Sequence, residues 1–103
     1  MQTSENNFYD KCYKVISLIP LGKVATYSAI AEALNSKAYR AVGNAMAKNP
    51  HLISVPCHRV IKSNGLIGGY ALGSSKKINL LRKEGLFIKH GKVVDFKKNI
   101  HIF

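Results

Sequence analysis

The sequence predicts a single domain of the α+β class that is mainly helical. Its 103 residues, 47% of them apolar, suffice for one hydrophobic core but not for a second domain. Apolar residues recur at helical spacing through the first half, whereas short β-rich runs around Asn-Gly and His-Gly turns occupy much of the second. Two short helices joined by a tight turn, with a hairpin after them, predict a winged helix-turn-helix-like domain over residues 1–103, with a small β-hairpin wing.

The first predicted helix runs from Ser4 to Ile19 and carries an apolar stripe that includes Cys12 and Ile16. Cys12 is therefore expected in the core. A turn over residues 20–23, with a proline and a glycine, ends this helix.

Two further helices are predicted next. Thr26 is placed to cap a short helix that turns Ile30 inward. Ser36 is expected to cap a third helix over residues 37–48, which Asn49-Pro50 ends because the residue before a proline disfavours helical geometry.

The third helix carries mostly small side chains. Tyr39 and Arg40 are the long side chains near its start, and it lacks the Gln, Asn and Arg cluster of a helix that reads base edges in the major groove. A slim helix of this kind can press against a narrow groove. Its alanines equally fit simple helix propensity and tight packing, and the residues alone leave both interpretations open.

Short strands and turns are predicted in the second half. A strand at residues 60–61 is expected to pair through the Asn64-Gly65 turn with residues 66–67, because Asn-Gly between β-rich runs is a strong hairpin signal. Residues 86–88 and 92–94 predict a second small hairpin.

One more helix is predicted between the two hairpins. Ser74 or Ser75 is expected to cap it, and it should run to Glu84 and end at Gly85. The tail, residues 95–103, is expected to be loosely held.

The chain is strongly basic. Sixteen Lys and Arg against five Asp and Glu give a net charge of +11, which indicates a polyanionic partner. The alternatives are a generally solvated basic surface and a membrane-surface binder; the second is weaker because no stretch combines a basic face with an aromatic-rich apolar face. With no apolar run of membrane length and a polar N-terminus, we expect no membrane association and a cytosolic protein, in a prokaryotic cytosol or nucleoid or in a eukaryotic nucleus.

The two cysteines, Cys12 and Cys57, do not have the spacing of a metal-ligand pair, and the four histidines are scattered. We therefore expect reduced thiols, no disulfide and no metal or other cofactor.

The stretch from Val55 to Val60 is the one place where a nucleophile and a base are adjacent. A thiol attacks as the thiolate, and a nearby histidine is the usual means of activating it. If Cys57 and His58 are extended, their side chains leave opposite faces, so we expect the proton to pass through one water. The alternative is that Cys57 is an ordinary small buried residue.

Six short motifs together resemble the O6-alkylguanine-DNA alkyltransferase family. The resemblance covers roughly residues 8 to 88, and the Pro-Cys-His-Arg block is its most specific part. The matching segments are Thr26-Tyr27, Arg40-Ala41-Val42-Gly43, Asn49-Pro50, Pro56-Cys57-His58-Arg59-Val60, Gly69-Tyr70-x-x-Gly73 and Glu84-Gly85.

This resemblance implies direct repair of duplex DNA that contains O6-alkylguanine. The family binds from the minor groove through its helix-turn-helix, flips the damaged guanine out and moves the alkyl group irreversibly onto a cysteine. By position, Cys57 is the alkyl acceptor, His58 the base acting through water, and Glu84 the residue that orients and charges His58. Asn49 ties the active-site turn together, and Tyr27 hydrogen-bonds the guanine ring and helps neutralise it.

The resemblance also assigns DNA-contacting and pocket residues. Arg40 enters the base stack in place of the flipped nucleotide, and the main chains of Cys57 and Val60 read the guanine edge. The other expected DNA contacts are Tyr39, Ala41, Gly43 and Asn44, and the expected pocket residues are Tyr27, Val60, Gly69, Tyr70 and Ala71. The expected state is a monomer that can cluster on DNA.

Other functions fit parts of the same sequence. Many family members carry an additional N-terminal domain, which we expect this chain to lack. Short relatives called alkyltransferase-like proteins bind alkylated DNA without reacting, and in them the cysteine is replaced, commonly by Trp; the presence of Cys57 and the absence of any Trp favour a reactive protein. A winged-helix regulator and a cysteine hydrolase are weaker alternatives, because the third helix lacks base-reading side chains and no oxyanion-hole motif is evident.

Overall fold

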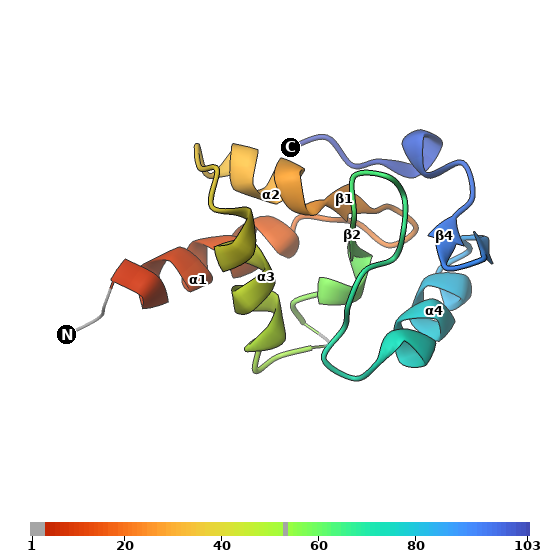
Figure 1. The fold of residues 1–103 in the computed structure, drawn as a ribbon, viewed down its shortest axis with the longest axis horizontal. Helices are drawn as coiled ribbons and strands as arrows, with labels where there is room; N and C mark the ends of the chain where they lie inside the picture. The colour runs from red at the N-terminus through yellow and green to blue at the C-terminus, as the bar shows by residue number, and fades with distance from the viewer. Residues whose placement is uncertain (1–3, 53) are drawn as a thin grey trace.

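The computed structural model describes residues 4–52 and 54–103 of the chain (Figure 1). Four helices, two pairs of very short strands and two 3-10 turns make up the fold of these described residues. In chain order they are α1 (Ser4–Ile16), β1 (Ala25–Thr26), α2 (Tyr27–Ala33), α3 (Tyr39–Ala47), η1 (Cys57–Arg59), β2 (Val60–Ile61), α4 (Ser74–Lys83), β3 (Ile88–Lys89), β4 (Lys92–Val93) and η2 (Phe96–Asn99).

The first three helices pack around one apolar core. Cys12 and Ile16 of α1, Ile30 of α2 and Val42 of α3 are fully buried in it, as the helical spacing predicts. The Thr26 side chain accepts the Ala29 N–H at 3.1 Å and caps α2, which satisfies one of the donors left free at a helix start. The helix-turn-helix formed by α2 and α3 is confirmed.

A second core lies under α4 and the hairpin of β3 and β4. Val24, Ile61, Leu81 and Val93 are fully buried there. The parallel pairing of β1 with β2, Ala25 to Val60 and Thr26 to Ile61, joins the two halves of the chain. Because η1 leads directly into β2, the Pro-Cys-His-Arg stretch lies at the junction of the two cores.

Two predicted helix caps are wrong. α3 begins at Tyr39, two residues later than expected, because the Ser36 hydroxyl accepts the nearby Ala38 N–H and closes a local turn instead of capping the helix. α4 is preceded by Gly73 at φ +95°, a left-handed conformation that glycine adopts without a Cβ clash, and no serine side chain caps it.

The predicted hairpin at Asn64-Gly65 forms its turn but not its second strand. The Lys62 N–H donates to the Leu66 carbonyl at 2.9 Å, but Leu66 then forms a β-bridge with Lys92. The segment therefore bonds to β4, and β2 pairs with β1. The second predicted hairpin is confirmed as the antiparallel pair of β3 and β4.

The C-terminal tail is held more tightly than its sequence predicts. It contains η2, and the main chain of Val24 accepts from the His101 N–H at 2.8 Å and donates to the Asn99 carbonyl at 2.9 Å. These bonds tie the tail to the segment just before β1.

Candidate active site

The Cys57–Arg59 segment forms a 3-10 turn, so the extended Cys57-His58 pair considered from the sequence does not occur. Pro56 precedes the turn, and its carbonyl accepts the Arg59 N–H at 2.9 Å. Cys57 and His58 are both buried, and within the described part of the chain no hydrogen bond joins their side chains.

Asn49 holds the cysteine in place. Its Nδ2 donates to Cys57 Sγ and to the Val55 carbonyl, both at 3.0 Å, and its Oδ1 accepts the His51 N–H at 2.8 Å. Burial raises the pKa of the Cys57 thiol, while the Asn49 hydrogen bond and the positive charge of Lys77 oppose that rise. The amide thus ties the turn to the sulfur and partly offsets the cost of forming a buried thiolate.

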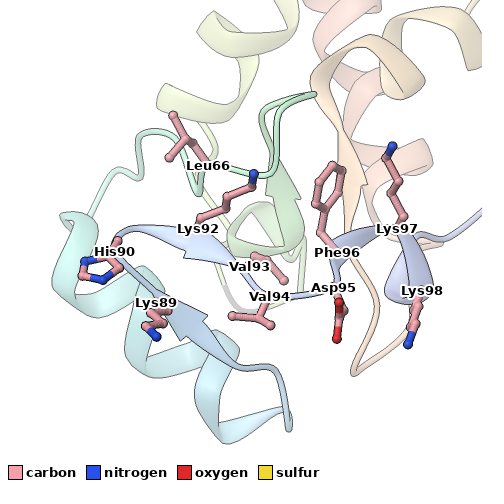
Figure 2. Close-up of a pocket in the computed structure, with 10 residues that line it drawn as sticks. All are labelled: Leu66, Lys89, His90, Lys92, Val93, Val94, Asp95, Phe96, Lys97 and Lys98. Carbon is pink, nitrogen blue, oxygen red and sulfur yellow. The ribbon is translucent and has the colours of Figure 1, made fainter.

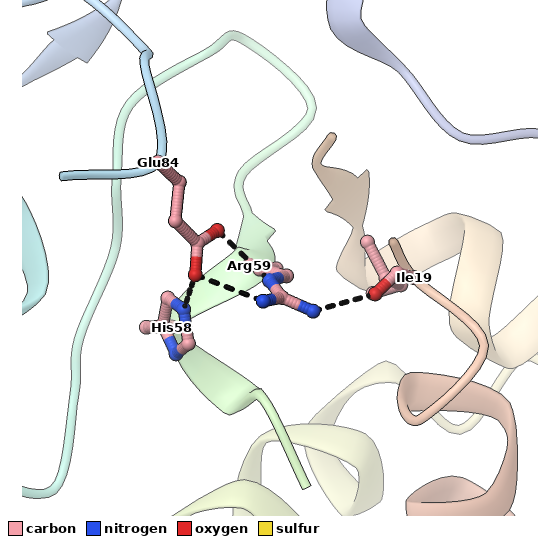
Figure 3. Close-up of polar contacts among 4 residues, drawn as sticks. All are labelled: Ile19, His58, Arg59 and Glu84. Carbon is pink, nitrogen blue, oxygen red and sulfur yellow. Dashed lines mark hydrogen bonds and ion pairs between the residues drawn. The ribbon is translucent and has the colours of Figure 1, made fainter. Parts of the chain in front are cut away.

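The Glu84 carboxylate lies beside the His58 ring, at Nε2 (Figure 3). Glu84 Oε2 lies 2.8 Å from His58 Nε2, and Arg59 donates to both Glu84 oxygens at 2.9 Å and to the Ile19 carbonyl at 2.8 Å. Burial by itself would raise the pKa of Glu84, but the bonds from Arg59 and His58 bring it below its ordinary value. Glu84 is therefore ionised and fixes the orientation of the imidazole.

Burial favours the neutral form of His58. Burial lowers its pKa below 6.5, and the hydrogen bond and charge of Glu84 oppose this shift without reversing it. Nε2 points to Glu84, and Nδ1 is buried without a hydrogen-bond partner in the described structure. The ring can therefore accept a proton at Nδ1.

Lys77 is a fully buried cation next to this group. Its Nζ donates to the Val60 carbonyl at 2.7 Å and to the Gly69 carbonyl at 3.0 Å. Burial lowers its pKa from 10.5 to about 8, with the charge of Cys57 acting in the opposite direction. Lys77 therefore holds β2 against the loop over residues 68–73, which we call the glycine loop, and supplies a positive charge near the thiol.

Cys57 lines a cavity of about 210 Å³ between α3 and the glycine loop. The structure brings the predicted residues Tyr27, Gly69, Tyr70 and Ala71 together there. The full set of lining residues is Tyr27, Gly43, Met46, Ala47, Cys57, Gly69, Tyr70 and Ala71.

The phenols at this cavity stay protonated. Burial, with a smaller contribution from Cys57, raises the pKa of both Tyr27 and Tyr70, so each can donate a hydrogen bond. The Tyr70 hydroxyl is buried without a partner in the described structure. Val60 is not among the lining residues, because its side chain is fully buried and its carbonyl accepts from Lys77.

The exposed face of α3 borders the cavity. Arg40 and Asn44 are exposed, and Gly43 and Ala47, one turn apart on the same side, line the cavity wall. Tyr39 is 45% exposed and, with Tyr27, lines a second hollow of about 440 Å³. Ala41 is half-buried.

Neither a metal cluster nor a membrane-spanning helix is found in the described part of the chain. No group of three or more His, Cys, Asp or Glu side chains among residues 4–52 and 54–103 is arranged to hold a metal ion. None of the helices in those residues has the length and apolar character needed to cross a bilayer.

A family model supplies the deciding comparison. The model described as "6-O-methylguanine DNA methyltransferase, DNA binding domain" matches residues 7–86. The chain belongs to the 6-O-methylguanine DNA methyltransferase family. The resemblance inferred from the short motifs is thereby confirmed.

Relatives and solved structures agree with this membership. A methylated-DNA–protein-cysteine methyltransferase of Metallosphaera sedula is 45% identical over 89 residues, which are 86% of this chain and 56% of that protein. S. pombe Atl1, solved with damaged DNA containing O6-carboxymethylguanine, is 31% identical with a TM-score of 0.83, covering 98% of both chains. Mycobacterium tuberculosis OGT, solved with DNA, is 38% identical with a TM-score of 0.75, covering 82% of this chain and 51% of that one. The chain spans about half the length of the curated methyltransferases that it matches.

Two residues in the site of this methyltransferase-family chain receive no role from sequence reasoning. Arg59 lies inside the Pro-Cys-His-Arg block, but only the fold shows that it shares Glu84 with His58. Lys77 reads as a surface lysine, and the one signal against that is its position four residues before Leu81 on the buried stripe of α4.

Proposed function

We propose that this chain repairs O6-alkylguanine in duplex DNA by transferring the alkyl group to Cys57, once per molecule. The observation that carries the proposal is that Cys57 lines a cavity bordered by the exposed face of α3. Pockets for drug-sized ligands measure about 300–1,000 Å³, so a volume of about 210 Å³ suits a single nucleobase. Relatives named methyltransferase support alkyl transfer, and the DNA complexes of Atl1 and OGT support DNA as the partner.

The target base has to leave the duplex to reach this sulfur. A stacked guanine cannot enter a cavity inside the protein, and extrusion costs a few kcal/mol. Arg40, exposed on α3, takes the place of the extruded base in the stack and offsets part of that cost. The small side chains at Gly43 and Ala47 let the helix approach the minor groove closely, and that groove's degenerate code suits a protein that inspects every sequence.

The transfer uses His58 as the base and Cys57 as the nucleophile. The thiol proton passes through one water to Nδ1 of His58, whose other nitrogen Glu84 holds at 2.8 Å. The sulfur–carbon bond forms as the bond between carbon and O6 breaks, and the electron pair stays with the guanine. The protonated phenol of Tyr27 hydrogen-bonds the ring and delivers the proton that neutralises it. The proton held on His58 then passes through water to the Tyr27 phenolate, so both side chains end in their starting protonation states. The products are S-alkylcysteine and intact guanine.

Two buried side chains stabilise the developing thiolate, Asn49 by a hydrogen bond and Lys77 by its charge. Asn49 hydrogen-bonds Sγ at 3.0 Å, and the Lys77 charge lowers the pKa of the thiol against the effect of burial. Since the site holds these groups before DNA arrives, they need no reorganisation during the reaction.

A second candidate function is binding of the lesion without reaction, as a signal to other repair proteins. The observation in its favour is that this chain shares its fold with S. pombe Atl1, solved with damaged DNA containing O6-carboxymethylguanine, at 31% identity and a TM-score of 0.83. The placement of Cys57 at the cavity wall, with Asn49 bonded to it, favours the reactive function.

The two functions differ in what happens to the DNA. A duplex with one O6-methylguanine, supplied in excess over the protein, would be incubated with it, digested to nucleosides and analysed for the remaining lesion. Transfer predicts loss of one lesion per protein molecule with the wild type, and no loss with Cys57→Ala. Retention of the lesion by a wild-type protein that binds the duplex tightly would support the signalling function instead.

The net charge supports duplex DNA as the partner. A monomeric state, clustering along DNA and a location in the cytosol, nucleoid or nucleus stay predictions from the sequence.

A further inference from the structure

The hairpin end of the molecule carries an apolar groove bordered by lysines. We call it the wing groove (Figure 2). A hollow of about 540 Å³ lies along β4 and η2. The residues that define the groove are Leu66, Lys89, Lys92, Val94, Phe96 and Lys97.

The floor of the wing groove is apolar and partly open to solvent. Leu66 is 38% and Val94 39% exposed. The Phe96 ring packs directly on Gly65, where an added Cβ would lie 2.6 Å from the ring Cδ1 and 2.9 Å from Lys92 Cε. The glycine therefore lets the ring and the lysine stem lie close against the backbone.

The groove continues towards the end of α4. A second hollow of about 590 Å³ shares Lys89 and Val94 with the first and also contacts Phe87, which is 77% exposed. An aromatic side chain so exposed beside further apolar groups is typical of an interaction surface. Because they share Lys89 and Val94, the two hollows are neighbours, and we call the surface that they cover between Phe87 and Phe96 the track.

The rim of the track is positively charged. Lys89, Lys92 and Lys97 are exposed, as is Lys98 beside them, and Asp95 is the one carboxylate among the residues lining either hollow. Arg82 at the far end is already positioned, because it donates to the Ile88 carbonyl at 3.0 Å. The partner should therefore carry negative charge along its length.

We propose that the wing groove, together with its continuation to Phe87, binds an extended acidic segment of another protein. In that segment Asp or Glu alternates with apolar side chains. The lysines pair with the carboxylates, and Phe87, Val94 and Phe96 are covered by the apolar residues between them. A DNA backbone offers the negative charge, but only its deoxyribose carbons could cover these side chains, so it fits less well. This inference does not depend on alkyl transfer.

The location of the groove allows DNA and the peptide to bind together. Figure 1 shows α1, α2 and α3 towards one end of the molecule and the hairpin of β3 and β4, with α4, towards the other. The longest dimension of the chain is 43 Å. A partner held here leaves the exposed face of α3 free.

The test uses a fluorescein-labelled twelve-residue peptide of alternating Glu and Leu or Phe, with fluorescence anisotropy as the readout. We expect the wild type to bind it, and Lys89→Glu with Lys97→Glu to weaken binding about tenfold or more. Phe87→Ser should weaken binding without any change in charge. The matched control is Lys11→Glu with Lys14→Glu, the same charge change at exposed positions of α1, which should alter affinity by less than about twofold.

Three outcomes would overturn the proposal. The first is no binding by a wild-type protein whose circular dichroism shows it folded. The second is equal binding of a peptide with Ser in place of Leu and Phe, together with no effect of Phe87→Ser, because that describes only a solvated basic surface. The third is competition by an unmodified duplex with an equal loss of duplex affinity in the Lys89, Lys97 variant, which would make the groove a DNA contact.

Discussion

Replacing Lys77 with Met is expected to slow the reactions of the Cys57 thiol while changing the unfolding free energy only modestly. The substitution keeps most of the side-chain volume but removes the buried charge and both hydrogen bonds of Nζ, at 2.7 Å to Val60 and 3.0 Å to Gly69. Without that charge, the pKa of the thiol rises further above its ordinary value, because burial is then less opposed.

Two opposing contributions to the free energy of unfolding explain the small effect on stability. Holding the pKa of Lys77 at about 8 instead of 10.5 corresponds to about 3 kcal/mol of unfavourable free energy at neutral pH. Each hydrogen bond from a charged donor contributes about 1.5–3 kcal/mol in the other direction. The variant should therefore differ from the wild type by no more than about 2–3 kcal/mol in unfolding free energy.

The pH dependence of this difference has a defined sign. Because the pKa of Lys77 is lower in the folded state, the native protein loses this proton first as pH rises. The stability of the wild type relative to Lys77→Met should therefore rise between about pH 8 and pH 10.5 and stay level below that window.

The assay is the rate of iodoacetamide labelling of Cys57 against pH, together with urea unfolding. Lys77→Met should lower the labelling rate below about pH 8, where the wild-type Lys77 is charged, and the two profiles should converge above it. Lys76→Met, the same change at an exposed position of α4, should leave the profile in place. An unchanged profile would refute the electrostatic role of Lys77. A loss of more than about 5 kcal/mol in unfolding free energy would mean that Lys77 is chiefly structural.

Three further predictions concern other parts of the molecule. Glu84→Gln should raise the apparent pKa of the reactive thiol in the same labelling assay. The variant should also lose less stability than the wild type on acidification below pH 4.5, since the lowered pKa of Glu84 contributes stability only while the carboxylate is ionised. Arg40→Ala should leave affinity for undamaged duplex largely intact, by anisotropy, and slow the loss of O6-methylguanine at least about tenfold, because a few kcal/mol of extrusion lose their compensation; an unchanged transfer rate would exclude that role. Gly65→Ala should destabilise the fold by about 2–4 kcal/mol, because the new Cβ would meet the Phe96 ring and the backbone there has φ +90°. Gly91→Ala, at φ +72° with open space around it, should cost about 1 kcal/mol from backbone strain alone. Equal losses in urea unfolding would contradict this difference.

Much of the fold is predictable from the sequence because its determinants are local. The stripe through Cys12 and Ile16 has the helical period that burial of one face requires, and the Thr26 cap lies where an unpaired N–H needs an acceptor. The pairing of β1 with β2 escapes prediction, because two residues per strand are too few for any alternating pattern.

The residues of the site also fall into those that the sequence predicts and those that it does not. Cys57, His58 and Glu84 are found through short motifs, and the fold brings His58 and Glu84 together across 26 positions of sequence. Lys77 escapes prediction because a lysine is almost never fully buried unless it is paired, and its acceptors are carbonyl groups that no side-chain pattern reveals.

The most direct test of the central claim is the intact mass of the protein after incubation with a saturating amount of duplex containing O6-methylguanine. We predict a gain of one methyl group per molecule, located by peptide mapping on Cys57 and absent from Cys57→Ala. A folded, DNA-bound wild type with no gain in mass, or a methyl group found on Cys12, would contradict the account.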